Sequence, residues 1–328
     1  MAFLIKIKRG FIRRNFPAAF LACLLLCLGG CGQRQAQPLQ GQTFALDTII
    51  TVTLYGEGAD PEVLQGCLDL CADYEKVFSR TREDSELYRL NAAGGGTVSA
   101  PMRQVLETAL DYCALTGGRF DITMGGVSAL YGFSSQSPSA PTAEALAEAM
   151  AHTGYETVHL EGDTLTFDDP ETVLDLGAVA KGYIADRMKE YLQAHGVEHA
   201  LLNLGGNVLA LGGKPDGALF RVGVQYPEAG SRETVAVLAV DDQSVVTSGV
   251  YERAFQQDGR TYHHLLDSAT GEPLDNGLLA VTVIAARSVD ADALSTAVFA
   301  LGLEEGMALL DSREDAWGVF ITQDLQLH

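Results

Sequence analysis

Short strand-like runs follow one another through the C-terminal half of the chain, and this succession restricts the possible folds more than any other feature. The runs are rich in β-branched residues or alternate apolar with polar positions, as strands of a half-buried sheet do. Between two of them stands Asp258-Gly259, a dipeptide typical of a two-residue β-hairpin. The pattern therefore predicts a largely antiparallel sheet. The runs lie at residues 200–203, 208–211, 220–225, 234–239, 244–247, 252–256 and 261–266.

Amphipathic helices are predicted around these strands. Two of them carry a proline in the first turn, at Pro61 and Pro101, and Thr142 is the expected N-cap of a third. No repeat or linker divides the folded part, so we expect one α+β domain with largely antiparallel or mixed sheets and flanking helices. Helices are expected at residues 61–78, 101–115, 142–151, 178–195, 290–301 and 304–310, and further strands at 43–55, 157–160, 164–167, 173–176 and 318–321.

The net charge of the chain limits which partners it can bind. The 328 residues include 22 Lys and Arg against 43 Asp and Glu, a formal net charge of -21. Binding to a phosphate backbone needs clustered basic residues, so a nucleic-acid partner is excluded. With 47% apolar and 20% charged residues, the composition is that of a globular protein.

The N-terminal segment has the organisation of an export signal. Basic residues gather at 6–14, and residues 18–28 form an uncharged apolar run, shorter than the roughly 20 residues that span a bilayer. The run ends in Leu28-Gly29-Gly30-Cys31, which resembles the lipobox of bacterial lipoproteins. An uncleaved anchor or an ordinary signal peptide are the alternatives.

The lipobox resemblance implies that residues 1–30 are a signal peptide and that Cys31 is lipidated. Residues 31–41 are then expected to be a tether, and residues 42–328 the folded domain. We expect the domain to be exported and lipid-anchored at the outer face of the bacterial cytoplasmic membrane, or in the periplasm.

Three further cysteines belong to the folded part. Cys67 and Cys71 are four residues apart on the predicted helix 61–78, and Cys113 lies on the next one. With no histidine nearby in sequence they make a poor metal set, so we expect small core residues. A disulfide that involves Cys113 remains an alternative.

Common nucleotide and hydrolase motifs are absent from the sequence. It contains no glycine-rich dinucleotide motif after a strand, no P-loop, no zinc-protease H-E-x-x-H, no C-x-x-C and no G-x-S-x-G.

Two segments have the features of an anion site. Residues 175–182 lead from a strand into a helix, where Asp175 ends the strand and Lys181 adds a positive charge to the free N–H groups of the first turn. The alternative is an ordinary turn that Asp175 caps. The pair Gly205-Gly206 allows close backbone approach to a ligand, or forms a simple hairpin turn.

Two further segments have acid–base or metal-binding features. His264 and Asp267 lie where a predicted strand runs into a turn, as a base or a ligand pair, or as structural residues. Asp292 and Thr296 are four residues apart and share one helix face, where a carboxylate and a hydroxyl suit Mg²⁺. The alternative for this pair is a helix cap and a back-bonded threonine.

Taken together, these segments resemble the FAD:protein FMN transferase (ApbE) family. The matches follow the family's order over most of residues 42–321, and the lipoprotein signal is common among members. The resemblance implies an α+β architecture related to the T-fold. The matching segments are Leu46-Asp47-Thr48, Asp84-Ser85-Glu86-Leu87 with Leu90-Asn91, and residues 118–123, 175–182, 203–207, 264–273 and 292–296.

The family implies that bound FAD is cleaved at its pyrophosphate, that FMN passes to a Thr or Ser hydroxyl of an acceptor protein, and that AMP leaves. By resemblance, the Ala178 carbonyl with Asp292 and Thr296 would hold Mg²⁺, and His264 and Asp267 would lie at the reaction centre. Because the protein is strongly acidic, it needs a bound cation to hold the negatively charged pyrophosphate. The residues that would line the FAD site are Leu46, Thr81, Arg119, Phe120, Asp121, Asp175, Lys181, Gly205, Gly206, Asn207 and Leu266.

The sequence departs from the family pattern at two places. Ser79-Arg80-Thr81 lacks the tyrosine that members usually carry there, and Asp267-Ser268 replaces the commoner Asp-Pro. Two alternative functions remain: an enzyme that hydrolyses FAD to FMN and AMP, and a non-catalytic FAD-binding lipoprotein.

Overall fold

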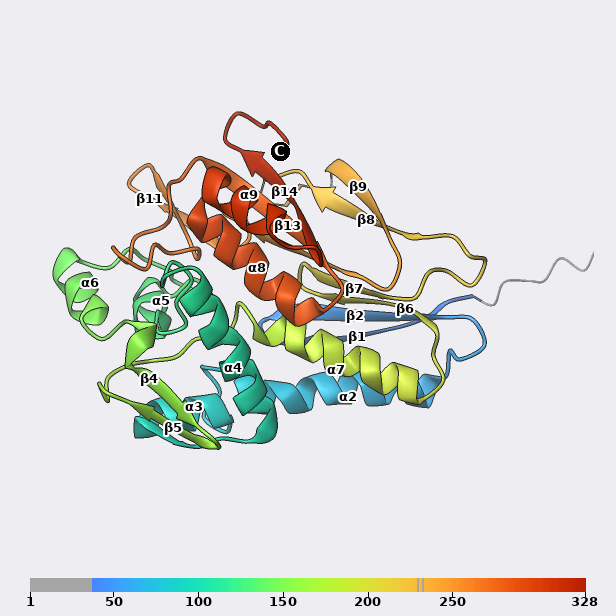
Figure 1. Cartoon of the computed structure of the whole chain (residues 1–328), viewed down its shortest axis with the longest axis horizontal. Coiled ribbons are helices and arrows are strands. Elements are labelled where there is room, and N and C mark those ends of the chain that lie inside the picture. The colour runs from blue at the N-terminus through green and yellow to red at the C-terminus, as the bar shows by residue number, and fades with distance from the viewer. Residues whose placement is uncertain (1–36, 229, 232) are drawn as a thin grey trace, which may run out of the picture. The chain divides into compact units, whose positions relative to one another are not determined.

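The computed structural model describes residues 37–228, 230–231 and 233–328, and its largest element is a seven-stranded sheet (Figure 1). Every neighbouring pair of strands in this sheet is antiparallel. The predicted α+β class with antiparallel sheet is therefore confirmed. In spatial order the strands are β1 (Leu39–Ala45), β2 (Thr48–Tyr55), β6 (His199–Leu204), β7 (Asn207–Leu211), β10 (Ser244–Gly249), β13 (Leu278–Ala285) and β14 (Ala316–Thr322).

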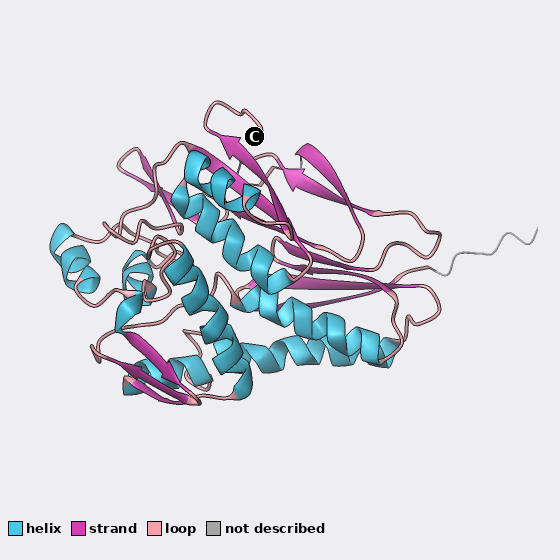
Figure 2. Ribbon diagram, viewed as in Figure 1, coloured by secondary structure: helices cyan, strands magenta, loops and turns pink. Residues whose placement is uncertain are grey.

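Helices cover one face of this sheet, and a separate hairpin covers part of the other (Figure 2). Successive residues of a strand point to opposite faces. On β10, Val246 belongs to the main core with the helices, whereas Val245 packs with Phe220 of the hairpin. The helices are α2 (Pro61–Phe78), α7 (Ala180–Ala194), α8 (Ser288–Leu301) and α9 (Leu303–Asp311), and the hairpin strands are β8 (Phe220–Gln225) and β9 (Thr234–Val240).

The remaining elements build a region beside the main sheet. Ser85 caps the first helix of this region by accepting a hydrogen bond from Tyr88 N at 3.0 Å. The Asn91 side chain bonds both backbone polar groups of Leu174 at 2.9 Å, which fixes the segment that leads to Asp175. The elements are α3 (Glu86–Ala93), α4 (Ala100–Leu115), α5 (Gly125–Tyr131), α6 (Ala143–Met150), the 3₁₀ helix η1 (Tyr155–Thr157), the sheet β3 (Gly95–Thr97), β5 (Thr164–Phe167) and β4 (Val158–Glu161), and the hairpin β11 (Ala254–Gln257) and β12 (Arg260–His263).

The predicted single strand at 43–55 is wrong, because the chain reverses within it. Leu46 and Asp47 form a two-residue turn between β1 and β2 with φ angles of 56° and 58°. Few residues other than glycine adopt this conformation, so the sequence carries no common turn signal there. Tertiary structure supports the turn, since Glu75 Oε1 accepts a hydrogen bond from Leu46 N at 2.6 Å.

Other strand predictions differ in extent. Residues 173–176 form no ladder and make a single bridge between Val173 and Met124. The strand predicted at 261–266 ends at His263. β13 was not predicted, because a strand covered on both faces is a continuous apolar run without alternation. The Asp258-Gly259 hairpin is confirmed, with both residues at positive φ.

Cys67, Cys71 and Cys113 are free and fully buried. The disulfide that involves Cys113 is therefore not formed, and the prediction of core residues is confirmed. Burial raises the pKa of each thiol to about 12.

The boundary predicted between tether and domain at residue 42 is too late, because β1 begins at Leu39 and pairs with β2 over its whole length. The predicted signal peptide and lipidation at Cys31 lie outside the described residues. No helix within the described part of the chain is long and apolar enough to cross a membrane.

Candidate functional site

Close packing of α7 on α8 positions the first candidate carboxylate. Gly182 lies where the helices meet, and a Cβ there would stand 2.3 Å from Ser288 O. Asp292 reaches back across this contact, and its Oδ2 accepts a hydrogen bond of 2.8 Å from Gly182 N. Asp292 is only 3% exposed, so its charge depends on such partners.

A lysine ammonium lies between the turn before α7 and Asp292. Lys181 Nζ donates to Gly177 O at 2.7 Å and stands 3.9 Å from Asp292 Oδ1. Ala178 belongs to the same turn and is half-buried. The structure therefore brings one cation close to both the Gly177 carbonyl and the Asp292 carboxylate.

Hydroxyl groups line the next turn of α8. Thr296 lies one turn after Asp292, and its Oγ1 is 3.2 Å from Ser248 Oγ at the end of β10. Ser295 Oγ lies 2.9 Å from the same hydroxyl. A carboxylate, hydroxyls and backbone carbonyls are hard oxygen donors, which fit Mg²⁺. The described residues contain no group of three or more His, Cys, Asp or Glu that could hold a metal, so these donors would share the ion with ligand oxygens.

The glycine pair forms the tight turn between β6 and β7. Gly205 and Gly206 have φ angles of 63° and 94°, and a Cβ at Gly205 would stand 2.3 Å from Thr48 Oγ1. The hairpin interpretation is thus confirmed. The close approach that Gly205 allows is the approach of Thr48, at the start of β2, to its backbone. The Asn207 side chain is 1% exposed, and its Oδ1 accepts a hydrogen bond from Ser288 Oγ at 2.9 Å.

Asp175 closes the turn before α7. Its Oδ1 accepts from Gly177 N at 2.9 Å, and its Oδ2 accepts from Arg80 Nε at 3.0 Å. The carboxylate therefore closes the turn at Gly177, but it does not cap α7, whose N-cap residue is Val179. Thr81 follows Arg80 and is exposed, with its backbone N–H bonded to Ser79 Oγ at 3.4 Å.

The segment 119–121 directs two of its three side chains inward. Phe120 is 3% exposed and packs edge-on against Tyr112, with ring centroids 6.5 Å apart. Asp121 accepts from Thr123 N and Oγ1 and from Tyr155 N, and burial raises its pKa. Only Arg119 extends to solvent, so a ligand would meet this segment through Arg119 or the backbone.

His264 lies directly after β12, where its backbone N–H donates to Arg253 O at 3.1 Å. Its Nδ1 is sealed from solvent and has no hydrogen-bond partner. Burial, together with the positive charges of Arg253 and its neighbours, lowers the pKa of this imidazole to about 3. The ring is therefore neutral at physiological pH.

Asp267 closes the turn that follows. Its Oδ1 accepts from Ala269 N at 2.8 Å, its backbone N–H donates to Glu272 O, and Leu266 pairs with Pro273. Within the part of the chain that the structure describes, no hydrogen bond joins Asp267 to His264. His264 and Asp267 are neighbours because they are three residues apart in the sequence, and they do not form a bonded pair.

Sequence reasoning missed Glu252, which follows β10. Its carboxyl lies near Lys181 and Asp292, and its Oε1 would be 3.3 Å from a Cβ on Gly206. Glu252 lies at the surface, but the surrounding protein partly desolvates its carboxyl, and this desolvation together with the charge of Asp292 raises its pKa to about 7. The available signal was the charged pair Glu252-Arg253 directly after a buried strand.

Sequence reasoning also missed Asp186 on α7, whose two oxygens accept hydrogen bonds from Ser288 N and Val289 N. The signal here was spacing. Gly182 and Asp186 are four residues apart on α7, as Ser288, Asp292 and Thr296 are on α8, so each set lies along one helix face.

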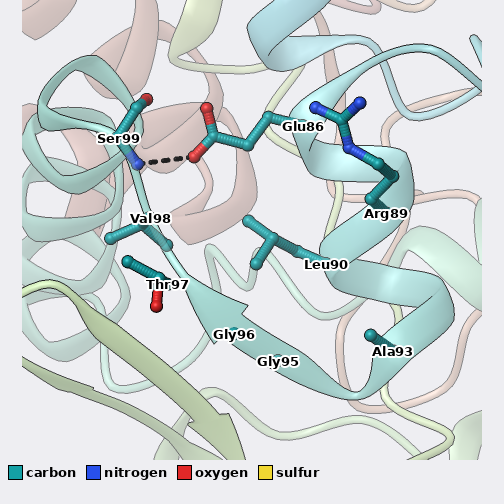
Figure 3. Close-up of a pocket in the computed structure, with 9 residues that line it drawn as sticks. All are labelled: Glu86, Arg89, Leu90, Ala93, Gly95, Gly96, Thr97, Val98 and Ser99. Carbon is teal, nitrogen blue, oxygen red and sulfur yellow. Dashed lines mark hydrogen bonds between the residues drawn. The ribbon is translucent and has the colours of Figure 1, made fainter.

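A separate groove lies between α3 and β3 (Figure 3). Glu86 Oε1 accepts a hydrogen bond from Ser99 N there at 2.6 Å. The groove contains none of the predicted site residues. Its charged lining residues are Glu86 and Arg89, and the Glu86 carboxylate is bonded to Ser99 N.

Comparison with known proteins gives a consistent result. The model of the ApbE family matches residues 46–321. The FAD:protein FMN transferase of Treponema pallidum is 35% identical, over 93% of this chain and 90% of its own length. That of Klebsiella pneumoniae is 38% identical, over 84% and 86%.

Solved structures of similar proteins agree with the fold. The flavin transferase ApbE from Vibrio cholerae superimposes with a TM-score of 0.79 at 30% identity, covering 89% of this chain and 96% of that one. The ApbE protein of Thermotoga maritima gives 0.82 at 29% identity, with the same coverage.

Proposed function

The chain belongs to the ApbE family, and we propose on this premise that it is an enzyme that transfers FMN from FAD to a hydroxyl of an acceptor protein. Relatives named FAD:protein FMN transferase match this chain over most of its length. The observation that carries the proposal is the meeting of Lys181, the turn before α7 and Asp292. This arrangement presents positive charge and hard oxygen donors where a pyrophosphate needs them.

In the proposed reaction, a Thr or Ser hydroxyl oxygen of the acceptor attacks the phosphorus on the FMN side of the pyrophosphate. A new phosphorus–oxygen bond forms, the bond to the bridging oxygen breaks, and AMP leaves with that oxygen. The hydroxyl proton passes to a base. Mg²⁺, held by Asp292, Thr296 and the Ala178 carbonyl, would neutralise charge on the phosphate oxygens when bound.

The chain's own groups have distinct proposed roles. The Lys181 ammonium, beside the start of α7, attracts the pyrophosphate. His264 would accept the hydroxyl proton, and Asp267 fixes the loop that follows it. The Gly205-Gly206 turn would contact the nucleotide through its backbone, since Thr48 already fills the space beside Gly205. The other residues matched to the FAD site, including Leu46, Thr81 and Arg119, would contact FAD around this centre.

One assay separates the candidate functions. The full chain is incubated with FAD, Mg²⁺ and a peptide that carries an acceptor threonine, with EDTA in a parallel sample. A peptide mass gain of one FMN with AMP release supports transfer, and AMP without that gain supports hydrolysis. Binding of FAD with neither product would leave a flavin-binding protein. We expect transfer, and we expect EDTA to abolish it.

We further propose that the protein is exported and anchored by lipid at Cys31. The basic residues at 6–14, the apolar run at 18–28 and the sequence before Cys31 support this location. Replacing Cys31 by Ser in an expressing bacterium should move the protein from the membrane fraction to the soluble fraction. Unchanged membrane association would contradict the lipid anchor.

A further inference from the structure

Helices α7 and α8 each begin without a capping side chain of their own. Val179 precedes α7 and Arg287 precedes α8, and neither side chain accepts a hydrogen bond from its helix. The first N–H groups of a helix have no partner within it, and leaving them unpaired in a protein interior is costly. Both helix starts are buried, since Ala180 and Ser288 are 4% and 0% exposed.

Each helix start receives a carboxylate from the other helix instead. Asp186 on α7 accepts from Ser288 N at 2.8 Å through Oδ1, and from Val289 N at 3.0 Å through Oδ2. Asp292 on α8 accepts from Gly182 N at 2.8 Å. The capping is therefore reciprocal, and both exchanges take place along one helix–helix contact.

This exchange restricts how α8 can move relative to α7. Asp186 holds the first turn of α8, and Asp292 comes one turn after Ser288 on the same face. The contact between α7 and α8 leaves no space for a side chain at Gly182, because a Cβ there would stand 2.6 Å from Val289 Cα. A shift of the first turn of α8 would therefore move Asp292 and Thr296 relative to Lys181.

The start of α8 is also bonded to the sheet. Ser288 Oγ donates to Asn207 Oδ1 at 2.9 Å and accepts from Ser244 Oγ at 2.9 Å. These bonds fix Ser288 from the sheet side, whereas Asp186 fixes its backbone from the α7 side. The position of Asp292 thus depends on a network that extends beyond its own contacts.

We propose that Asp186 is a positioning residue for the oxygen donors of the metal site. The proposal rests on the proposed function insofar as Asp292 and Thr296 are taken as ligands. Asp186 touches neither ligand group. It acts by capping α8, which sets where Asp292 and Thr296 stand opposite the turn that contains Ala178.

The test measures metal binding directly in the full chain. Mn²⁺ is the probe, since it takes the same oxygen ligands as Mg²⁺ and can be followed by electron paramagnetic resonance. Loss of a group that orients metal ligands typically costs 10–100-fold in affinity. We expect Asp186→Ala to weaken Mn²⁺ binding by about 10-fold or more. Asp186→Asn keeps one acceptor oxygen and should give a smaller loss.

Asp60 supplies the matched control. Its Oδ1 accepts from Glu62 N and Val63 N at the start of α2, so it too caps two N–H groups. Asp60→Ala should lower the urea midpoint of unfolding and leave Mn²⁺ affinity unchanged. If a folded Asp186 variant binds Mn²⁺ as tightly as the parent, or if Asp60→Ala weakens Mn²⁺ binding equally, the positioning role is wrong.

Failure of the proposed function gives a different pattern. A parent protein that binds Mn²⁺ through Asp292 but transfers no FMN contradicts the transfer reaction and leaves the role of Asp186 standing. A parent protein that binds no Mn²⁺ overturns the positioning role and the metal assignment, whereas the peptide assay still decides transfer.

Discussion

Asp292 Oδ2 accepts a hydrogen bond of 2.8 Å from the backbone nitrogen of Gly182, a residue 110 positions earlier in the chain. One oxygen of the carboxylate is thereby committed to the start of α7, whereas Oδ1 faces the Lys181 ammonium at 3.9 Å. The same side chain is both a structural acceptor and the proposed metal ligand. Variants that separate these two roles test the site directly.

Asp292→Asn and Asp292→Ala should differ in stability but not in activity. Asn retains an oxygen for Gly182 N, whereas Ala leaves that buried N–H unpaired at a cost of about 1–3 kcal/mol in unfolding free energy. Both remove the charged ligand, so both should abolish FMN transfer while largely sparing FAD affinity. Urea unfolding, the peptide assay and FAD fluorescence measure the three quantities. Normal turnover with Mg²⁺ in either variant would contradict the metal assignment.

Gly182→Ala should destabilise the protein although alanine favours helices. The new Cβ would stand 2.3 Å from Ser288 O, and backbone cannot move aside cheaply. The overpacking cost of about 1–3 kcal/mol or more exceeds the gain of about 1 kcal/mol in helix propensity. Gly126→Ala in α5 is the control, because its Cβ would meet nothing closer than Val173 at 4.0 Å. Equal unfolding midpoints for the two variants in urea would disprove this account.

His264→Asn should slow FMN transfer by about 10²–10⁴-fold, the usual range for loss of a general base, with FAD affinity retained. Because the pKa of His264 is lowered to about 3, the ring stays unprotonated between about pH 5 and pH 8 and should add no acid limb to kcat/KM in that range. Steady-state kinetics across this range check both statements. His159→Asn, at an exposed position on β4, is the control. A fully active His264→Asn variant would remove this residue from the mechanism.

The pair His152 and Asp169 should make stability depend on pH. His152 Nδ1 lies 2.6 Å from Asp169 Oδ2, and this hydrogen bond raises the pKa of the imidazole above its ordinary value of 6.5. A raised histidine pKa stabilises the fold fully below the unfolded value, and the contribution is lost as pH rises through the folded value. Asp169→Asn should therefore lower the urea midpoint more at about pH 5.5 than at about pH 8.5. A loss that is equal at both pH values would be inconsistent with the ion pair.

The sequence predicted local structure correctly where the hydrogen-bonding partners lie within a few residues of each other. Thr142 caps α6 through Ala145 N, as its position before the apolar run predicts. Asp258-Gly259 forms its hairpin turn for the same reason, since both residues tolerate positive φ. The resemblance on ordered motifs likewise identified the family that the comparisons show.

The predictions were wrong where a group far away in the sequence determines the local backbone conformation. The turn at Leu46-Asp47 contains no glycine and depends on the hydrogen bond from Leu46 N to Glu75. Several matched residues also proved to have inward partners. Phe120 lies in the core, and the carboxylate of Asp121 is taken up by Thr123 and Tyr155.

The sequence by itself determined the longer helices, the cap of α6 at Thr142, and the placement of Asp292 and Thr296 on one helix face, because these depend on bonds and spacings within a few residues. Only the tertiary structure decided that Asp186 caps α8 while Asp292 caps α7, and that the Lys181 ammonium stands 3.9 Å from Asp292. These contacts join residues far apart in the chain. They exist because packing on the sheet brings two helix starts together, and buried N–H groups there must find acceptors.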